Sequence, residues 1–313
     1  MRRIALIASI LLLAPGCDKT SSDASQGTAA STDLAGTTIL FQVFGPSQEP
    51  RIAPIALLRG GALEPLTLSP TEWRGFDSVY FAVGTRIPIY RFSAQVGEME
   101  ITRGMWSGGG PVLYEVPGCR DVVPQAIGRL HATAPMEGTV ELLATSVAVA
   151  QISDTRAFPR QSETNAKGRS LTSAVAAGAQ IGPEDLSSLD FHARYLRTGA
   201  GPNGRTLLAS YIDPNAGDLG PGAGNTAVIL ALAEDSAAVM NTSYQHALSG
   251  EARSVEFQRL LNFADLDGDG LSELVLETWR YAGIPDLAVL SYRDGRWRET
   301  FRVGLDWCVG KER

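Results

Sequence analysis

The stretch FADLDGDGLSELVLETW, residues 263–279, places a compact acidic turn directly before an apolar run. Within nine residues it carries four carboxylates: Asp265, Asp267, Asp269 and Glu273. Gly268 and Gly270 lie among them. Because glycine adopts positive φ angles without a steric penalty, the backbone can turn sharply at these two positions. The run SELVLETW that follows favours a strand. The stretch therefore predicts two β-strands joined by an acidic loop.

A bound cation would stabilise this loop. Two carboxylates about 5 Å apart repel each other by roughly 3 kcal/mol at an effective dielectric constant near 20. Calcium binds about six to eight oxygen atoms, backbone carbonyls among them, and the carbonyl of Leu271 is the natural candidate here. Magnesium demands stricter octahedral geometry. Zinc and copper favour histidine or cysteine, and neither lies nearby in the sequence. The loop therefore predicts a calcium site.

The spacing also separates families of calcium loops. An EF-hand requires an acid at position 12 of the loop, and Leu276 occupies that position. The pattern D-x-D-G-D-G-x-x-E with a strand behind it resembles the FG-GAP/VCBS family, the calcium loops of integrin-type β-propellers and related bacterial surface proteins. The resemblance covers residues 263–303. The ligands that it implies are Asp265, Asp267, Asp269, Glu273 and the backbone carbonyl of Leu271. The family more often has aspartate where this chain has Glu273. One copy cannot form a propeller, so the resemblance implies a local hairpin and not the overall fold.

The N-terminus predicts export and a lipid anchor. A short basic start, MRR, precedes an apolar run at residues 4–14. This run is shorter than the roughly 20 residues of a transmembrane helix and is typical of a secretory signal. The sequence LAPGC follows and resembles the lipobox of bacterial lipoproteins, which implies a signal peptide over residues 1–16 and an acylated Cys17. The polar residues 17–36 are expected to form a flexible tether. An ordinary cleaved signal is the alternative.

Composition fits a folded, exported protein. Hydrophobic residues make up 44% of the chain and charged residues 19%, which is ample material for a core. The net charge of −7 offers no basic footprint for nucleic acid. If Cys17 carries lipid, Cys119 and Cys308 remain as a pair in an oxidising compartment, and we expect a disulfide between them. Two separate buried thiols are the competing interpretation.

The rest of the chain is interpreted as two β-rich parts joined by a short helical segment. Residues 37–150 contain strand-like runs and a tight hairpin at Gly60 and Gly61, and are expected to form an N-terminal β domain. Residues 151–189 are expected to be a linker with short helices. Its alanine-rich piece is the only convincing helical stretch after the tether. Residues 190–313 are expected to form a C-terminal β domain that contains the acidic loop.

The end of the C-terminal domain predicts a second hairpin. Asp294 and Gly295 form a turn signal between two strand-like arms. Trp297, Phe301 and Val303 are expected to share one face of the second arm. The predicted fold is mainly β, with sandwich or open antiparallel sheets and not a full propeller.

Other motifs in the sequence do not indicate a functional site. GAGPNG, residues 199–204, matches G-x-G-x-x-G, but the strand-like run after it favours a hairpin loop. The histidines His131, His192 and His246 form no metal-binding or hydrolase signature. The tryptophans near the C-terminus, Trp279, Trp297 and Trp307, are expected to pack a β core.

These features predict a calcium-binding, mainly β lipoprotein of the bacterial cell envelope, periplasmic or surface-facing. The chain would act as a binding or structural module, attached to the membrane by its N-terminal lipid, with calcium in a structural role. Its partner would be a protein or a glycan. The alternative is an exported hydrolase whose catalytic residues are scattered along the chain and converge in a concave pocket.

Overall fold

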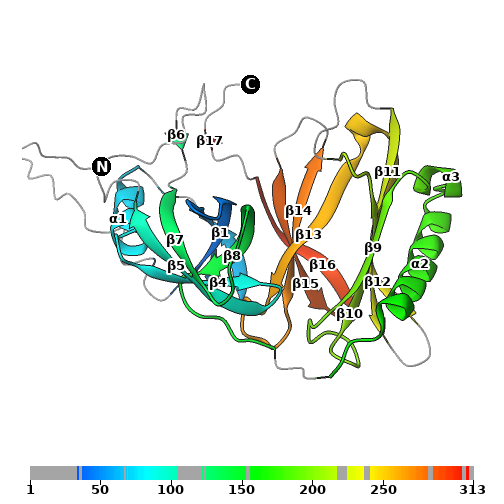
Figure 1. Cartoon of the computed structure of the whole chain (residues 1–313), viewed down its shortest axis with the longest axis horizontal. Coiled ribbons are helices and arrows are strands. Elements are labelled where there is room, and N and C mark those ends of the chain that lie inside the picture. The colour runs from blue at the N-terminus through cyan, green and yellow to red at the C-terminus, as the bar shows by residue number, and fades with distance from the viewer. Residues whose placement is uncertain are drawn as a thin grey trace, which may run out of the picture.

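The computed structural model confirms a mainly β fold. It describes residue 34, residues 37–66, residue 68 and residues 70–104, 121–122, 125–152, 156–216, 224–235, 240–280, 285–304 and 308–309. Within these residues the strands form antiparallel sheets of seven, four, four and two strands. The molecule consists of a barrel, two stacked sheets beside it, and a helix on the far side (Figure 1). No helix within the described ranges is long and apolar enough to cross a membrane.

The N-terminal part is a barrel closed by its first strand. The sheet order is β1-β8-β4-β5-β7-β2-β3, and the sheet closes because β1 also pairs with β2. Its strands are β1 (Thr38–Pro46), β2 (Arg51–Arg59), β3 (Ala62–Pro65), β4 (Arg86–Arg91), β5 (Ala94–Arg103), β7 (Ala126–Ala132) and β8 (Thr139–Thr145). The expected hairpin joins β2 to β3 through Gly60 and Gly61, both at positive φ.

A helix that the sequence did not predict packs into the barrel core. Helix α1 (Pro70–Tyr80) contributes Phe76, and Phe81 follows directly behind it. Both rings are fully buried and lie 6.3 and 6.0 Å from the ring of Phe41 in β1. The expectation that the only helix lies in the linker is therefore wrong. Tertiary packing of aromatic side chains, which have modest helix propensity, stabilises this segment.

The C-terminal part is a sandwich of two four-stranded sheets. The first, which we call sheet C, has the order β12-β11-β10-β9, and the second, sheet D, has the order β13-β14-β15-β16. The strands of sheet C are β9 (Asp190–Leu196), β10 (Thr206–Ile212), β11 (Asn225–Asp235) and β12 (Met240–Glu251). Those of sheet D are β13 (Glu256–Ala264), β14 (Glu273–Arg280), β15 (Asp286–Arg293) and β16 (Arg296–Gly304). Leu208 and Leu232 of sheet C pack on Leu274 and Leu290 of sheet D. A short 3₁₀ turn (Ala252–Ser254) connects the sheets.

The outer face of sheet C is covered by a long helix. The segment expected to be a linker with short helices contains α2 (Gln161–Gly178) and the four-residue α3 (Pro183–Leu186). Leu171 and Val175 of α2 pack on the alanine-rich face of sheet C. A Cβ atom at Gly168 would lie 2.6 Å from Cβ of Ala193, so glycine permits this close approach. Helix α2 is thus an integral layer of the C-terminal part.

Sheet D is buried on both faces. Its second face packs on the barrel, where Val275 and Val289 contact Leu143 and Ile55. A register shift between Val289 and Leu290 marks a β-bulge in the β15–β16 pair. As a result Trp297 packs toward sheet C, whereas Phe301 and Val303 pack toward the barrel. The expectation that these three side chains share one face is therefore wrong.

Several expectations lie outside the described residues. These are the signal peptide, Cys17, nearly all of the tether, Cys119 and Trp307. The pair of short strands β6 (Asp121–Val122) and β17 (Cys308–Val309) places the backbone of Cys308 opposite that of Val122. Val122 lies three residues after Cys119 in the sequence. The Cys119–Cys308 disulfide remains a prediction.

Candidate metal centre

The acidic loop forms the tight connection between β13 and β14. Asp265 ends up 3% exposed, Asp267 is half-buried and Asp269 is exposed. One carboxylate oxygen from each of these residues lies within 4.8 Å of the other two. Within the part of the chain that the structure describes, no other group of three acidic, histidine or cysteine side chains is this close. The structure thus brings together three of the expected calcium ligands.

Backbone N–H groups hold these carboxylates in place. The two oxygens of Asp265 accept hydrogen bonds from the amides of Gly268 (2.8 Å) and Gly270 (3.1 Å). Oδ1 of Asp267 accepts from the amide of Asp269 at 3.1 Å, and Oδ1 of Asp269 accepts from the amide of Leu271 at 2.7 Å. Gly268 and Gly270 have φ angles of 80° and 88°, which give the loop its turns.

Glu273 is not part of the cluster formed by the three aspartates. It is 5% exposed, and its Oε2 accepts a hydrogen bond from the amide of Leu266 at 2.9 Å. Burial, together with the nearby charges of Asp267 and Asp269, raises the pKa of Glu273 to about 8. Burial also raises the pKa of Asp267, with additional repulsion from Asp269 and Asp265. Both groups are costly to ionise without a cation, which is the electrostatic property expected of a metal site.

The residues present fit a calcium ion. Asp265, Asp267 and Asp269 offer a hard, all-oxygen donor set. Glu273 lies outside this group, but it is buried and near enough to interact electrostatically with Asp267 and Asp269. Backbone carbonyls are common calcium ligands. Leu271, whose carbonyl was expected to be a ligand, lies in the loop between β13 and β14.

Three parts of the molecule meet at the loop. The amide of Ser272 donates to the carbonyl of Thr198 at 2.7 Å, so the loop is bonded to the β9–β10 connection. A Cβ atom at Gly199 would lie 2.4 Å from the carbonyl oxygen of Gly270, which shows how closely the two loops approach. The side chain of Leu266 is buried in the cluster shared with the barrel. The loop therefore joins sheet D to sheet C and to the barrel.

A buried asparagine strengthens the same junction, and sequence reasoning did not find it. Asn262 is fully buried at the end of β13, where a β-bulge shifts the register. Its side chain accepts from the amide of Phe92 at 2.6 Å and donates to the carbonyl of Tyr90 at 2.9 Å, both in the β4–β5 hairpin of the barrel. The carbonyl of Phe263 also accepts from the amide of Ser93 at 2.7 Å. A polar residue inside the apolar run LLNFA was the available signal.

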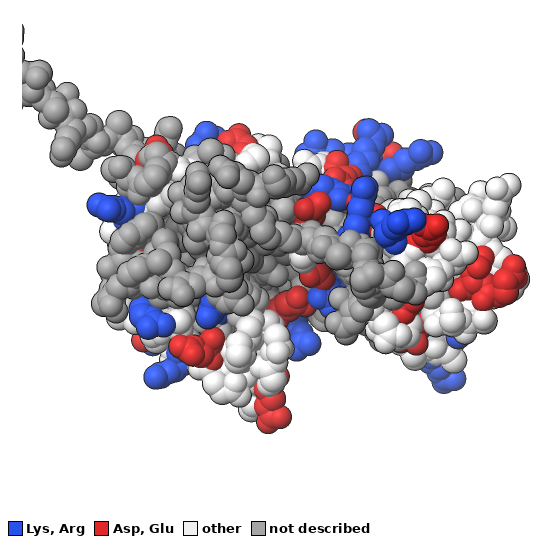
Figure 2. Space-filling view, turned by 90° about the horizontal axis from the view of Figure 1, so that it is seen from above, with Lys and Arg blue, Asp and Glu red and all other residues white. Residues whose placement is uncertain are grey.

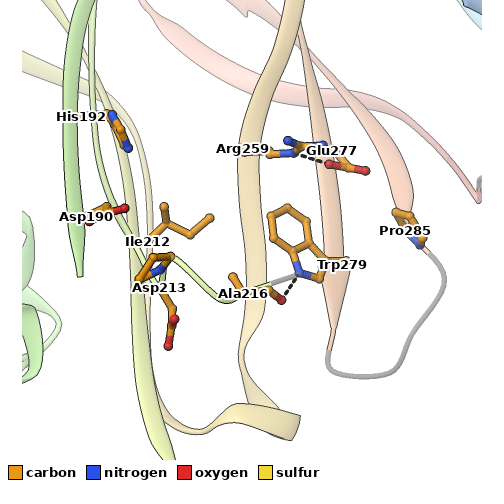
Figure 3. Close-up of a pocket in the computed structure, with 10 residues that line it drawn as sticks. Asp190, His192, Ile212, Asp213, Ala216, Arg259, Glu277, Trp279 and Pro285 are labelled. Atoms are coloured by element: carbon orange, nitrogen blue, oxygen red, sulfur yellow. Dashed lines mark hydrogen bonds and ion pairs between the residues drawn. The ribbon is translucent and has the colours of Figure 1, made fainter. Parts of the chain in front are cut away.

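A pocket of about 480 Å³ lies at the other end of β13 and β14. Asp190 and His192 of β9 and Ile212 of β10 line one side, and Arg259 of β13 with Glu277 and Trp279 of β14 line the other (Figure 3). Asp213, Pro214, Ala216 and Pro285 complete it. Arg259 forms ion pairs with Glu277 and, at 3.1 Å, with Glu141 of the barrel.

The three histidines do not converge. His131 lies in the barrel, 2.9 Å from Glu100. His192 and His246 lie on the two edge strands of sheet C, three strands apart, which corresponds to about 14 Å between their backbones. Nε2 of His246 lies 2.7 Å from the carbonyl of Glu256. Only His192 among them lines the pocket described above. The glycine motif at residues 199–204 is a β9–β10 hairpin loop, as expected.

Comparisons with known proteins give no relative. No protein-family model matches the chain, and no curated protein or solved structure matches it. The function must therefore be argued from the residues themselves. Among the side chains drawn in colour in Figure 2, acidic and basic residues are interspersed.

Proposed function

We propose that this chain is a calcium-binding structural module of the bacterial cell envelope, in which the metal fastens the barrel to the sandwich. The observation that carries the proposal is the convergence of Asp265, Asp267 and Asp269 at a loop that joins sheet D to sheet C and to the barrel. A cation there would offset the repulsion among the acids and hold the β13–β14 turn in one conformation.

The role proposed for calcium is structural and not catalytic. The loop is anchored by at least four backbone hydrogen bonds to its own carboxylates, and its flanking residues are buried. Neither a histidine nor a cysteine belongs to the described cluster of acids. Extracellular calcium modules have dissociation constants of about 10⁻⁴–10⁻³ M, so millimolar calcium outside the cytoplasm occupies about half of the weakest such sites and about nine-tenths of the tighter ones.

The experiment is thermal unfolding of the full-length chain with calcium or with chelator. At 2 mM calcium, a site of this affinity stabilises the folded state by about 0.6–1.8 kcal/mol. For a chain of this size the melting temperature rises by about 1–3 °C. Asp267→Ala abolishes the calcium-dependent increment, whereas Asp294→Ala, in the exposed β15–β16 turn, retains it. Equal melting with calcium and with chelator would sink the proposal. An increment with magnesium equal to that with calcium would remove its calcium specificity.

The proposed location is the cell envelope, with the chain held by a lipid on Cys17. The supporting observations are the signal-like residues 1–16 and the LAPGC sequence. The test is fractionation after expression in a bacterium. The native chain is expected in the membrane fraction, and Cys17→Ser in the soluble or unprocessed fraction. A Cys17→Ser chain that stays processed and membrane-bound would contradict a lipid anchor.

A second candidate, an exported hydrolase, is favoured by one observation: His192 shares a pocket with Asp190, Asp213 and Glu277. Within the described residues, however, His192 makes no hydrogen bond to a carboxylate or hydroxyl group, so the orienting partner of a general base is missing. Hydrolysis of model esters or glycosides that His192→Ala abolishes would establish this candidate.

A further inference from the structure

The pocket between sheets C and D has a composition that points to a class of ligand. Its volume of about 480 Å³ lies within the range of small-molecule sites, which is about 300–1,000 Å³. Three carboxylates line it, from Asp190, Asp213 and Glu277, together with one guanidinium, from Arg259. With His192 neutral, these four groups give the lining a formal charge of −2.

The positive charge of Arg259 is already engaged. Its guanidinium binds Glu277 and also reaches Glu141 of the barrel with two nitrogen–oxygen distances of 3.1 and 3.2 Å. Because Arg259 already forms ion pairs with two carboxylates, it does not neutralise the carboxylates on the opposite wall. The negative charge of the pocket is therefore concentrated on the side formed by β9 and the end of β10.

The two acids on that side are disposed differently. Asp213 is fixed, since its oxygens accept hydrogen bonds from the amide of Asn215 at 2.8 Å and from the hydroxyl of Thr226 at 3.3 Å. Asp190 is exposed, and its side chain has no hydrogen bond or ion pair with any described residue. Asp190 lies directly opposite Ile212 in the β9–β10 pair, so both side chains are on the same face of sheet C. An unpaired carboxylate thus lies beside an apolar side chain.

The opposite wall combines the Arg259–Glu277 ion pair with an apolar part formed by Trp279. The indole of Trp279 stacks on Phe257 with ring centroids 5.6 Å apart, and its Nε1 donates to the carbonyl of Ala216 at 2.9 Å. Pro214 and Pro285 also line the pocket. A tryptophan held in this way offers a fixed edge against which an alkyl chain or a sugar ring packs, and indole also attracts cations.

We propose that this pocket binds a small organic cation, a primary amine carried on a short aliphatic chain or on a sugar ring. The amine lies against Asp190, and the body of the molecule packs on Ile212 and Trp279, while Asp213 adds negative charge at the end of β10. An anion would be repelled, and a neutral solute would leave Asp190 without a partner. A divalent metal is a poorer fit, because the described carboxylates of the pocket do not converge as those of the acidic loop do. The proposal is independent of the calcium site.

The experiment is isothermal titration calorimetry on the full-length chain in calcium. The probes are spermidine, glucosamine and the neutral N-acetylglucosamine. Binding of spermidine or of glucosamine supports the proposal and tells an aliphatic amine from an amino sugar. Asp190→Asn is expected to weaken that binding about tenfold, because it removes one charge-assisted contact. The matched control is Asp294→Asn, which removes one carboxylate from an exposed turn and is expected to leave binding unchanged.

Three results would overturn the proposal. The first is no binding of spermidine or glucosamine at millimolar concentration. The second is equal binding of glucosamine and N-acetylglucosamine, since the charge of the amine would then be irrelevant. The third is an equal loss of binding in the Asp190→Asn and Asp294→Asn chains, which indicates non-specific attraction to an acidic protein. Asp190 is the exposed first residue of β9, so its isosteric replacement leaves the melting temperature unchanged, and that measurement accompanies each titration.

Discussion

The two ends of the β13–β14 hairpin both carry acidic side chains, but in opposite circumstances. At the closed end, Asp265 and Glu273 are almost fully buried and bonded to backbone amides. At the open end, Arg259 is shared between two acids of different sheets, and Asp190 of β9, across the pocket, is exposed. The difference indicates that acidic residues have two different roles at the two ends of the hairpin. Buried acids at the closed end contribute to the junction of the fold, and solvent-facing acids at the open end are available to a ligand.

This comparison predicts the largest loss of stability at the closed end, for Asn262→Ala. The substitution removes the side-chain partner of the part-buried amide of Phe92, of the amide of Phe263 and of the buried carbonyl of Tyr90. The expected decrease in the free energy of unfolding is about 3–5 kcal/mol, measured by urea denaturation. Asn262→Asp with its carboxyl protonated keeps an acceptor for the amide of Phe92 and an O–H donor for the carbonyl of Tyr90, so it is expected to cost less than alanine. A loss below about 1 kcal/mol for Asn262→Ala would break the comparison.

The next largest effect is expected for Gly199→Ala. Gly199 has a φ of 76°, and a Cβ atom there would lie 2.4 Å from the carbonyl oxygen of Gly270. Strain and steric overlap together are expected to cost about 2–4 kcal/mol and to weaken calcium binding, since the collision is with the loop itself. The matched control is Gly204→Ala, at a φ of 64° with its nearest neighbour 3.4 Å away, which tests the strain without the collision. Equal decreases in the free energy of unfolding for Gly199→Ala and Gly204→Ala would show that the β9–β10 loop is not in steric contact with the acidic loop.

The third prediction concerns pH and Glu273. Its pKa rises from 4.5 in the unfolded chain to about 8 in the folded chain without metal. The folded state therefore holds this proton more tightly, and the stabilisation that the proton provides is lost as the pH rises from about 5 to 8. The expected loss is about 1–3 kcal/mol over that window, at most about 1.4 kcal/mol per pH unit.

Unfolding of the metal-free chain at pH 5.5, 6.5 and 7.5 measures this dependence. Glu273→Gln, which cannot ionise, is expected to flatten it. Calcium is also expected to flatten it and to release a proton on binding, because the metal takes the place of the proton. A native chain that grows more stable from pH 5.5 to 7.5 without metal, with Glu273→Gln unchanged in slope, would contradict the assignment to Glu273.

The smallest effect is expected at the open end, for Arg259→Met. The replacement keeps an apolar stem and removes the charge that joins Glu141 to Glu277. Because Arg259 is half exposed, the expected cost is about 0.5–1.5 kcal/mol, and it decreases with added salt. Arg298→Met, whose partner Asp294 is highly exposed, is the control and is expected to cost less. If Arg259→Met destabilised the chain as much as Asn262→Ala, the open end would belong to the structural junction as well.

The sequence predicted the local features of this molecule and missed the long-range ones. The turns at Gly60 and Gly61 and at Asp294 and Gly295 were predicted because positive φ is a property of the residues themselves. The acidic loop was located for the same reason. Asn262 bonds to residues about 170 positions away, so no local pattern indicates its partner.

Helix α1 and the central position of sheet D were missed for a related reason. The aromatic residues of α1 resemble those of a strand until the barrel that buries them is known. The alternation of β16 predicted a single buried face, but the bulge sends Trp297 and Phe301 to opposite faces, because sheet D has a neighbour on each side. The pocket joins residues from four strands and could be found only once the two sheets were in place.

The closure of the barrel by β1 has a mechanical consequence. This strand is the first in the described part of the chain, and it is hydrogen-bonded on one side to β2 and on the other to β8. A pull on the chain ahead of Thr38 runs along the strand, at right angles to both rows of hydrogen bonds. The bonds must then break together under shear and cannot unzip one at a time. If the protein is tethered by its N-terminus, force on the tether would act on β1, a strand hydrogen-bonded on both sides, and the fold would resist unfolding by that force.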